Sequence, residues 1–428
     1  MAVAGTVIFR ARYLLPIVGP CIENGALRVR DGRIVDVGEA GSILGQGDSE
    51  NVVDFGDAVL LPPMANAHTH LELTHLPYWD AFAAEREYAS FTDWLLHLIG
   101  VLRGVPQEEF GFSLHDGIRR LLRCGTGAVG DIVSRLSARN AYENCPLRGR
   151  LFLEALGTDA DLNRQTFDIL HKILVDKAPG AMAYGLAPHS IYTLTLEFLQ
   201  QLSMLGSRLG LVQSIHVAES PEETTLVRDG CGPFAERLYP QVGWGGRIPP
   251  ARGVSPVGLL NQHDILRPGD LLVHGVQVSS RDIATIAGRG VYVVLCPRSN
   301  HRIGIGNAPV ADYRTAGVPL VLGTDSMASC DSLSLWDEVA FARQCFGDAL
   351  DPGTLLNMAT YEGARALGLA GEMGGLAPGY GAHFQVLQPS HLPRAGQLED
   401  FLCSAGRTGD VKALYLDGKP CNPSSASL

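Results

Sequence analysis

The stretch Met64-Ala-Asn-Ala-His68-Thr-His70-Leu-Glu72 decides the fold, because it contains the first residues along the chain that are suited to bind a metal ion, His68 and His70. Alternate residues of an extended chain point to the same side, so His68 and His70 can bind one metal ion together. The stretch follows the apolar run 58–61 and the pair Pro62-Pro63. We expect that run to be a buried strand with both imidazoles just beyond its C-terminal end, as in an α/β barrel. Among 13 histidines such a pair also arises by chance, so the interpretation depends on the residues further along.

The composition is that of a globular protein with a large core. The chain has 428 residues, 46% of them hydrophobic and 18% charged, which suffices for one barrel or for two to three ordinary domains. With 34 basic and 45 acidic residues the net charge is −11, and no run of Lys or Arg interrupts this balance. The charge excludes an electrostatic nucleic-acid surface and indicates a small-molecule partner.

Neither secretion nor membrane insertion is expected. The N-terminus has no basic segment followed by an apolar run, and the most apolar later segment, 95–102, is too short to cross a bilayer. The nine cysteines include no Cys-x-x-Cys pair, and a chain of this size needs no disulfides. We therefore expect a cytoplasmic protein without a nucleic-acid or membrane partner, and a homo-oligomer is left open.

Short strands are expected at both ends of the chain. Their patterns lie at 6–9, 25–30, 33–37, 382–387 and 412–416. Asp31-Gly32 is a typical hairpin turn between two of them. Neither end has enough strands to be stable alone, so we expect residues 1–58 and 380–428 to form one composite β-sandwich beside a catalytic domain at 59–379.

Between these ends, apolar runs alternate with segments of helical periodicity. The spacing of Phe110, Leu114, Ile118 and Leu121 predicts an amphipathic helix. Besides the run before His68, buried strands are expected at 127–133, 150–154, 182–186, 211–215, 270–273, 290–295 and 318–322. Parallel strands with crossover helices follow this order. Eight such units in about 310 residues predict an α/β fold, a (β/α)₈ TIM barrel with insertions, with a doubly wound sheet as the alternative.

Polar residues follow most of these strands, at the rim where a barrel builds its site. They are His68 and His70 after the first strand, His189 after the fourth, His216 and Glu219 after the fifth, His274 after the sixth, Arg298 and Asn300 after the seventh, and Asp325 and Ser326 after the eighth. A single histidine at such a position is more often structural. The common position of all these residues in the strand order predicts one shared site.

Taken in order, the motifs resemble those of the amidohydrolase superfamily, specifically its cytosine deaminase and chlorohydrolase-like branch. The motifs are His68-Thr-His70, His216-x-x-Glu219, His274, Cys296-Pro-x-Ser-Asn300 and Gly323-Thr-Asp325-Ser326. The resemblance spans nearly the whole chain and implies a (β/α)₈ barrel, a small β-sandwich and one divalent metal ion, zinc first and iron as the alternative. It also implies His68, His70, His216 and Asp325 as metal ligands, Glu219 as proton shuttle, and His274 as a contact of the substrate or of water.

The chemistry of these residues agrees with the resemblance. Three neutral imidazoles and one carboxylate suit Zn²⁺ or Fe²⁺ and leave a position for water, whose pKa a bound metal lowers towards ~7. Glu219, three residues past His216, can move protons to a ring nitrogen and to departing ammonia, and Asp325 can accept one as well. These residues predict hydrolytic deamination of an aromatic, amidine-like carbon.

A single metal ion is expected. Many members of the superfamily bind two metals bridged by a carbamylated lysine at the end of the fourth strand. Here that strand is followed by His189, and the nearest lysine, Lys177, precedes the strand. One metal favours deamination over cyclic-amide hydrolysis, and halide displacement stays open.

Within the branch, four segments look most like those of aminofutalosine deaminases of the alternative menaquinone pathway, namely 66–73, 91–94, 187–192 and 296–300. This resemblance implies a purine nucleoside that carries a benzoate. A guanidinium binds a carboxylate in bidentate fashion, so Arg298 is the expected ligand of that group. Asn300 and His189 are expected beside the ribose or the base, with Glu72 and Ser326 as further substrate contacts.

Several alternatives stay open. Adenosine, S-adenosylhomocysteine and methylthioadenosine deaminases share much of the pattern, and triazine-type chlorohydrolases use the same metal site for another leaving group. A barrel that has lost its chemistry and acts as a binding protein is the alternative from another class. The presence of all four metal ligands and of Glu219 argues against it. Pro63-Met64 stands where relatives usually have Pro-Gly, which leaves the local loop conformation open.

Overall fold

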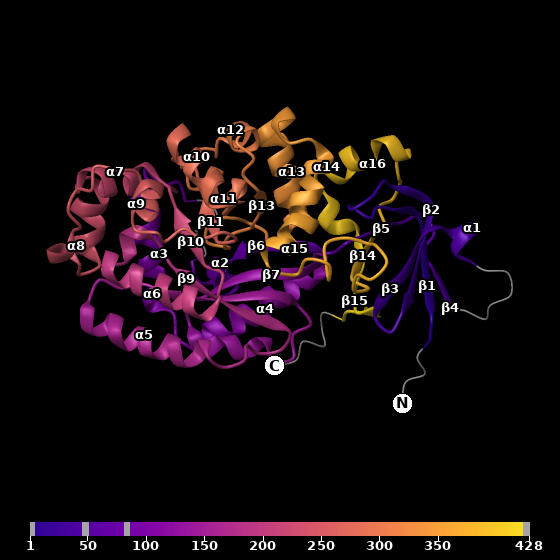
Figure 1. Cartoon of the computed structure of the whole chain (residues 1–428), viewed down its shortest axis with the longest axis horizontal. Helices are drawn as coiled ribbons and strands as arrows, with labels where there is room; N and C mark the ends of the chain where they lie inside the picture. The colour runs from indigo at the N-terminus through magenta and orange to yellow at the C-terminus, as the bar shows by residue number, and fades with distance from the viewer. Residues whose placement is uncertain (1–4, 45–50, 81–85, 423–428) are drawn as a thin grey trace.

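The computed structural model describes residues 5–44, 51–80 and 86–422. Within these ranges the chain forms one mixed sheet from its two ends and two parallel sheets that helices accompany (Figure 1). No helix of the described chain is long and apolar enough to cross a membrane. The nine cysteines are all free thiols.

Strands from both ends of the chain pair in one sheet, where the indigo and yellow strands of Figure 1 lie side by side. The strands are β1 (Val7–Leu14), β2 (Ile22–Arg30), β3 (Arg33–Glu39), β4 (Asn51–Asp54), β5 (Val59–Leu61), β14 (Phe384–Leu387), β15 (Val411–Leu416) and β16 (Lys419–Pro420). β5 connects the two ends, because it pairs parallel with β1 and antiparallel with β14. Asp31 and Gly32 form the β2–β3 turn with φ of 51° and 75°, as their sequence predicts.

The run 58–61 belongs to this sheet and not to the parallel sheets, so its prediction as the first barrel strand is wrong. Pro62 and Pro63 have no backbone N–H, and the pairing of β5 stops before them. A separate strand, β6 (Met64–Thr69), begins directly afterwards. β6 therefore contains His68, and His70 follows it. The pattern could not separate the two strands, because both are short and buried and only Pro62 and Pro63 stand between them.

Eight other strands of the described chain form two four-stranded parallel sheets. The first contains β6, β7 (Thr126–Val133), β8 (Arg148–Ala155) and β9 (Met182–Pro188); the second contains β10 (Ser214–Val217), β11 (Leu271–His274), β12 (Tyr292–Leu295) and β13 (Leu320–Leu322). Isolated bridges connect Leu186 with Gln213, at the β9–β10 junction, and Thr69 with Asp325, which follows β13. The structure thus confirms an α/β fold with parallel sheets, and its regular ladders do not run continuously around all eight strands.

The α-helices are α1 (Ala40–Ile43), α2 (Leu76–Trp79), α3 (Phe91–Gly104), α4 (Glu109–Arg123), α5 (Ala160–Leu174), α6 (Leu196–Leu209), α7 (Pro221–Asp229), α8 (Tyr239–Gln241), α9 (Pro256–Gln262), α10 (Ser280–Arg289), α11 (Pro297–Arg302), α12 (Val310–Thr315), α13 (Leu335–Phe346), α14 (Pro352–Asn357), α15 (Gly363–Ala366) and α16 (Leu398–Leu402). Helices α2 to α12 lie between successive parallel strands, α1 lies between β3 and β4 of the terminal sheet, and α13 to α16 follow β13. α4 buries Phe110, Leu114 and Ile118, the face that their spacing predicts.

Gln385 links the terminal sheet to the elements around the parallel sheets. It lies in β14 and is fully buried. Its Nε2 donates to the carbonyl of Pro62 at 2.9 Å, and its Oε1 accepts from Nε1 of Trp336 in α13 at 3.2 Å. Both partners are buried, so losing the amide would leave two polar groups unpaired.

We predict that Gln385→Ala lowers the free energy of unfolding by roughly 2–5 kcal/mol, because each unpaired buried group costs ~1–3 kcal/mol and the truncation adds a cavity. Urea and thermal unfolding followed by circular dichroism measure the change. Gln397→Ala, at an exposed position, is the matched control. Equal and small changes in both variants would contradict the linking role.

Candidate active site

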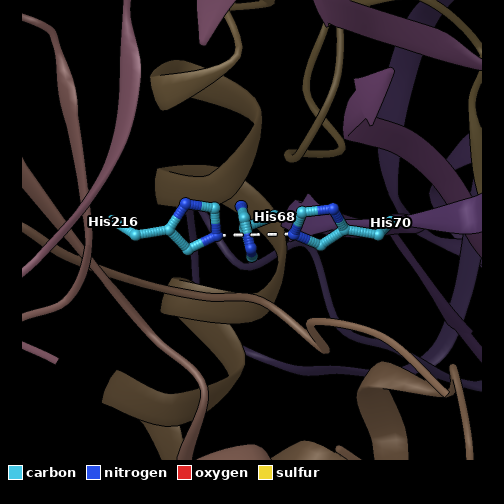
Figure 2. A group of neighbouring side chains, drawn as sticks. All are labelled: His68, His70 and His216. Carbon is cyan, nitrogen blue, oxygen red and sulfur yellow. Dashed lines mark hydrogen bonds between the residues drawn. The ribbon is translucent and has the colours of Figure 1, made fainter. Parts of the chain in front are cut away.

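Three imidazoles converge at the C-terminal ends of parallel strands (Figure 2). His68 lies in β6, His70 directly follows it, and His216 lies in β10. One ring nitrogen from each lies within 4.8 Å of the others. The Nε2 atoms of His70 and His216 are 3.4 Å apart. The arrangement brings together the three histidines that the sequence predicts as metal ligands.

Burial favours the neutral form of these imidazoles. It lowers the pKa of His68 and of His216, and it lowers the pKa of His70 to about 3. Nδ1 of His216 donates to the carbonyl of His189 at 2.8 Å, so its Nε2 carries the lone pair that faces His70. Both ring nitrogens of His68 are buried and have no hydrogen-bond partner in the described chain. Buried unpaired nitrogens with converging lone pairs fit a divalent metal ion.

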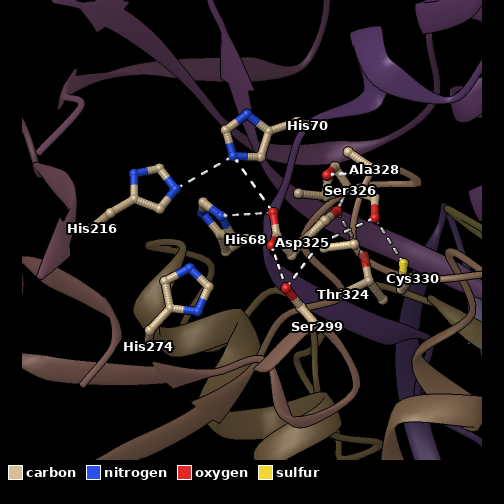
Figure 3. A network of polar contacts seen from close by, with 12 residues as sticks. His68, His70, His216, His274, Ser299, Thr324, Asp325, Ser326, Ala328 and Cys330 are labelled. Atoms are coloured by element: carbon tan, nitrogen blue, oxygen red, sulfur yellow. Dashed lines mark hydrogen bonds and ion pairs between the residues drawn. The ribbon is translucent and has the colours of Figure 1, made fainter. Parts of the chain in front are cut away.

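Asp325 adds a carboxylate to this cluster (Figure 3). Its Oδ1 lies 3.7 Å from Nε2 of His68 and from Nε2 of His70. Its Oδ2 accepts from the hydroxyls of Ser299 at 2.6 Å and Ser329 at 2.8 Å. Burial alone would raise the pKa of Asp325, but the neighbouring histidines outweigh it and hold the pKa well below its usual range. An ionised carboxylate beside three neutral imidazoles is a donor set that suits zinc or ferrous iron.

Glu219 and His274 lie beside the cluster, with Oε1 of Glu219 3.4 Å from Nε2 of His274. Burial, and after it the charge of Asp325, raises the pKa of Glu219 well above its usual range. The carboxylate of Glu223 accepts from the backbone N–H groups of Ala218 at 3.1 Å and Glu219 at 2.8 Å, which fixes the loop. The structure therefore places a carboxyl group whose burial favours the protonated form next to the predicted metal ligands.

The backbone at three of these positions is strained. Ala218, His274 and Asp325 have φ values of 52°, 74° and 56°, in the left-handed region that residues with a side chain rarely adopt. Such conformations persist only where the surrounding contacts hold them, and they gather at functional sites.

A cavity of about 350 Å³ lies over the cluster, and His70, His216 and Asp325 are part of its wall. One side of this cavity is apolar, and α3 and the segment 238–244 provide it. The apolar side consists of Phe91, Trp94, Leu95, Leu98, Ile99, Leu102, Leu238, Val242 and Trp244. A mostly apolar cavity of this size with a few convergent polar groups is typical of a small-molecule site.

Three of the predicted substrate contacts line this cavity, namely Glu72, His189 and Ser326. Burial raises the pKa of Glu72 to about 7, and its Oε2 accepts from the backbone N–H of Arg135 at 3.0 Å. Burial lowers the pKa of His189 to about 4, so its ring is neutral at pH 7.

Asn300 and Arg298 do not line the cavity, so their predicted contact with the substrate has to be corrected. Oδ1 of Asn300 lies 2.9 Å from Nδ1 of His274 and orients that ring. The guanidinium of Arg298 forms an ion pair with Asp331 and donates to the carbonyl of Ser332 at 3.1 Å. These partners satisfy Arg298 outside the cavity, and a sequence pattern cannot reveal a partner more than 30 residues away.

Sequence analysis misses three charged residues of the cavity wall, Arg103, Arg135 and Glu154. Arg135 comes shortly after β7, and Glu154 stands at the end of β8. A search for polar residues at the end of every strand would therefore have found both. The guanidinium carbon of Arg135 lies 4.5 Å from the centre of the Phe110 ring. Among the described residues, Arg103 is the other cavity residue with a guanidinium.

Known proteins resemble this chain in sequence. The sequence model described as "Amidohydrolase family" matches residues 59–421. The chain belongs to the amidohydrolase family. It is therefore an enzyme of a hydrolase family, and its histidine cluster fits the divalent metal ion that such enzymes bind.

Two relatives indicate where in the family the chain lies. It is 32% identical over 367 residues to an aminodeoxyfutalosine deaminase from Deinococcus radiodurans, covering 79% of this chain and 81% of that protein. It is 28% identical over 431 residues to a 5-methylthioadenosine/S-adenosylhomocysteine deaminase from Moorella thermoacetica, covering 97% of this chain and 94% of that one.

Two solved structures share the fold. An aminofutalosine deaminase from Helicobacter pylori, in complex with methylthio-coformycin, matches with a TM-score of 0.84 and 25% identity over 97% of this chain and all of that chain. A zinc-bound adenosine deaminase from Xanthomonas campestris matches with a TM-score of 0.78 and 25% identity, over 98% of this chain and 95% of that one.

We predict that His68→Ala and Asp325→Ala abolish tight metal binding while the chain still folds, because both side chains make their polar contacts within the histidine cluster near the strand ends. Elemental analysis should find about one divalent ion per chain in the wild type and much less in either variant, with unchanged far-UV circular dichroism. His301→Ala, an exposed histidine on α11, is the control. Two tightly held ions in the wild type would contradict a single site.

Proposed function

We propose that the protein is a metal-dependent hydrolytic deaminase of an adenine-type nucleoside, with aminofutalosine as its substrate and zinc as its metal. The observation that supports it best is the pairing of Glu219 with His274, 3.4 Å apart, beside three histidines and Asp325 at the floor of one cavity. The similarity to aminodeoxyfutalosine and aminofutalosine deaminases supports the substrate class. The menaquinone pathway is the proposed context.

Deamination adds water to the ring carbon that carries the amino group and yields a carbonyl and ammonia. When bound, a divalent ion lowers the pKa of its water towards ~7 and so supplies the nucleophile near neutral pH. Glu219 holds a proton, because burial raises its pKa, and it can donate this proton to the ring nitrogen beside that carbon. The carboxylate that results can take a proton from the water and deliver it to the departing nitrogen.

His274 and Asp325 assist this proton transfer. Asn300 holds Nδ1 of His274, which leaves Nε2 directed at Glu219 and at the substrate side. Asp325 is ionised, and its Oδ1 faces the histidines while two serine hydroxyls hold its Oδ2. It can accept a second proton from water, since a carboxylate keeps a free lone pair.

We further propose that the two parallel sheets act as one (β/α)₈ barrel. The bridges Leu186–Gln213 and Thr69–Asp325 connect the sheets at both junctions, and the metal ligands come from both sheets. In this arrangement the catalytic domain lies within residues 59–379 and begins after β5, while residues 1–58 and 380–428, together with β5, form the β domain.

Glu219→Gln should keep the metal and lose most of the turnover number, on the order of 10²- to 10⁴-fold, which is what general acid/base catalysis usually contributes. The amide fills the same space but cannot carry the proton. Ammonia release at saturating substrate measures kcat, and elemental analysis measures the metal. Near-normal turnover would show that Glu219 is structural and that Asp325 transfers the protons.

Deamination of methylthioadenosine or S-adenosylhomocysteine is the second candidate function. The apolar side of the cavity favours it, since α3 and segment 238–244 could cover an uncharged thioether. The Moorella relative also matches nearly the whole chain. The two candidates differ in whether the substrate carries a carboxylate, so a cation in the cavity can distinguish them.

Arg135 replaces Arg298 as the proposed ligand of a substrate carboxylate. Its guanidinium lines the cavity, and in the described chain it has no hydrogen bond or ion pair of its own. We predict that Arg135→Met lowers kcat/KM on aminofutalosine about 10- to 150-fold, as expected for a charged hydrogen bond of roughly 1.5–3 kcal/mol, and changes kcat/KM on methylthioadenosine little.

Arg298→Ala is the matched control for this comparison, because Asp331 and Ser332 already occupy its guanidinium outside the cavity. It should leave the ratio of kcat/KM between the two substrates unchanged. Deamination of methylthioadenosine or S-adenosylhomocysteine would be favoured by either of two results. One is an equal loss of kcat/KM on aminofutalosine and methylthioadenosine in Arg135→Met, and the other is a wild type that prefers methylthioadenosine.

A further inference from the structure

Glu154 is a cavity residue that neither the metal cluster nor the proposed proton transfer uses. It stands near the C-terminal end of β8, lines the cavity and is only 7% exposed. Its Oε2 accepts a hydrogen bond from the hydroxyl of Ser134. Its Oε1 is buried and has no partner among the residues that the structure describes.

A buried carboxylate oxygen without a donor is costly, because the solvation that it loses is not replaced. The nearby cation does not supply the missing contact. Arg135 lies over the ring of Phe110 at 4.5 Å, and no ion pair joins it to Glu154 within the described chain. Glu154 therefore has an unfilled acceptor position beside the cavity, and a bound molecule can fill it.

The chemistry of the proposed substrate identifies the donor. An adenine nucleoside has hydrogen-bond donors on its exocyclic amino group and on its sugar hydroxyls, and its base offers no other N–H when the sugar is attached. The amino group has to lie at the histidine cluster, where it is replaced. The sugar hydroxyls are then the donors left for an acceptor elsewhere in the same cavity.

We infer that Glu154 is a specificity-determining residue that accepts a hydrogen bond from a ribose hydroxyl of the substrate, an inference that rests on the proposed function. Glu72 lines the same wall, and its Oε2 is held by the backbone N–H of Arg135. The two carboxyl groups lie close to each other, so acceptor oxygens gather in one part of the cavity wall. Vicinal hydroxyls match such a wall, and an enzyme of this kind selects ribonucleosides over deoxynucleosides.

A competing role for Glu154 is to position His68, whose Nδ1 is also buried and unpartnered in the described chain. The two residues lie close enough for the charge of Glu154 to affect the pKa of His68, but no hydrogen bond or ion pair within 4.0 Å joins them. A positioning role predicts weaker metal binding in a Glu154 variant. Hydroxyl recognition predicts unchanged metal binding.

The test compares adenosine, 2′-deoxyadenosine and 3′-deoxyadenosine as ligands of the full-length, zinc-loaded protein. Ammonia release gives kcat and KM, isothermal titration calorimetry gives Kd, and elemental analysis gives the zinc content. The wild type should prefer adenosine over at least one deoxy analogue by about 10- to 150-fold in kcat/KM or Kd. Glu154→Gln should reduce this preference to within a few-fold, with unchanged zinc, because the amide keeps the shape but loses the charge. Glu143→Gln, at an exposed position, is the matched control and should keep the full preference.

Several outcomes overturn the inference. Ammonia release without any ribose preference would remove Glu154 from sugar recognition and leave the deaminase proposal intact. If Glu154→Gln lowers kcat/KM equally for all three nucleosides, Glu154 contacts the base and not the ribose. If Glu154→Gln loses zinc, Glu154 positions His68. If no adenine nucleoside binds or reacts, both proposals fail. Binding with a Glu154-dependent ribose preference but without turnover would support the inference and refute the deaminase.

Discussion

The contact between Asp325 and the segment around His68 is the constraint on which the structure depends, because it joins the last parallel strand to the first. The backbone N–H of Asp325 donates to the carbonyl of His68 at 3.1 Å, and the hydroxyl of Thr69 donates to the carbonyl of Asp325 at 2.7 Å. The same two segments carry three of the four predicted metal ligands. The junction that connects the two parallel sheets is therefore also the junction that brings the predicted metal ligands together.

Burial and neighbouring charged groups act against each other in this site. Burial favours the neutral forms of the histidines and of Glu219, while the histidines around Asp325 keep that carboxylate ionised. The pKa values of two carboxyl groups in one cavity are thus shifted in opposite directions because their neighbours differ. Such a separation provides an acid and an acceptor at the same pH, which is what a reaction with two proton transfers requires.

Most of the α/β fold, and the residues that cluster in the candidate site, could be predicted from sequence, since both follow from the strand order. Histidines and carboxylates at successive strand ends lie at one rim whatever the details of the helices. The prediction failed at 58–61, because a short apolar run carries no information about which sheet it joins. It also failed at Arg298, because its partners Asp331 and Ser332 lie on another loop. Arg135 and Glu154 also lie at strand ends, but neither belongs to a motif that points to them.

The cavity combines two kinds of wall with different origins. The parallel strand ends provide the polar wall, with Glu72, Glu154 and the metal ligands, whereas α3 and segment 238–244 provide the apolar wall. The walls are not independent, because Nε1 of Trp94 in α3 donates to the carbonyl of Ala328 at 3.3 Å, on the loop that also carries Asp325. A change in α3 can therefore alter both the shape that selects the substrate and the loop that holds the carboxylate ligand. Substitutions in α3 that change the substrate must therefore leave the loop with Asp325 and Ala328 in its position.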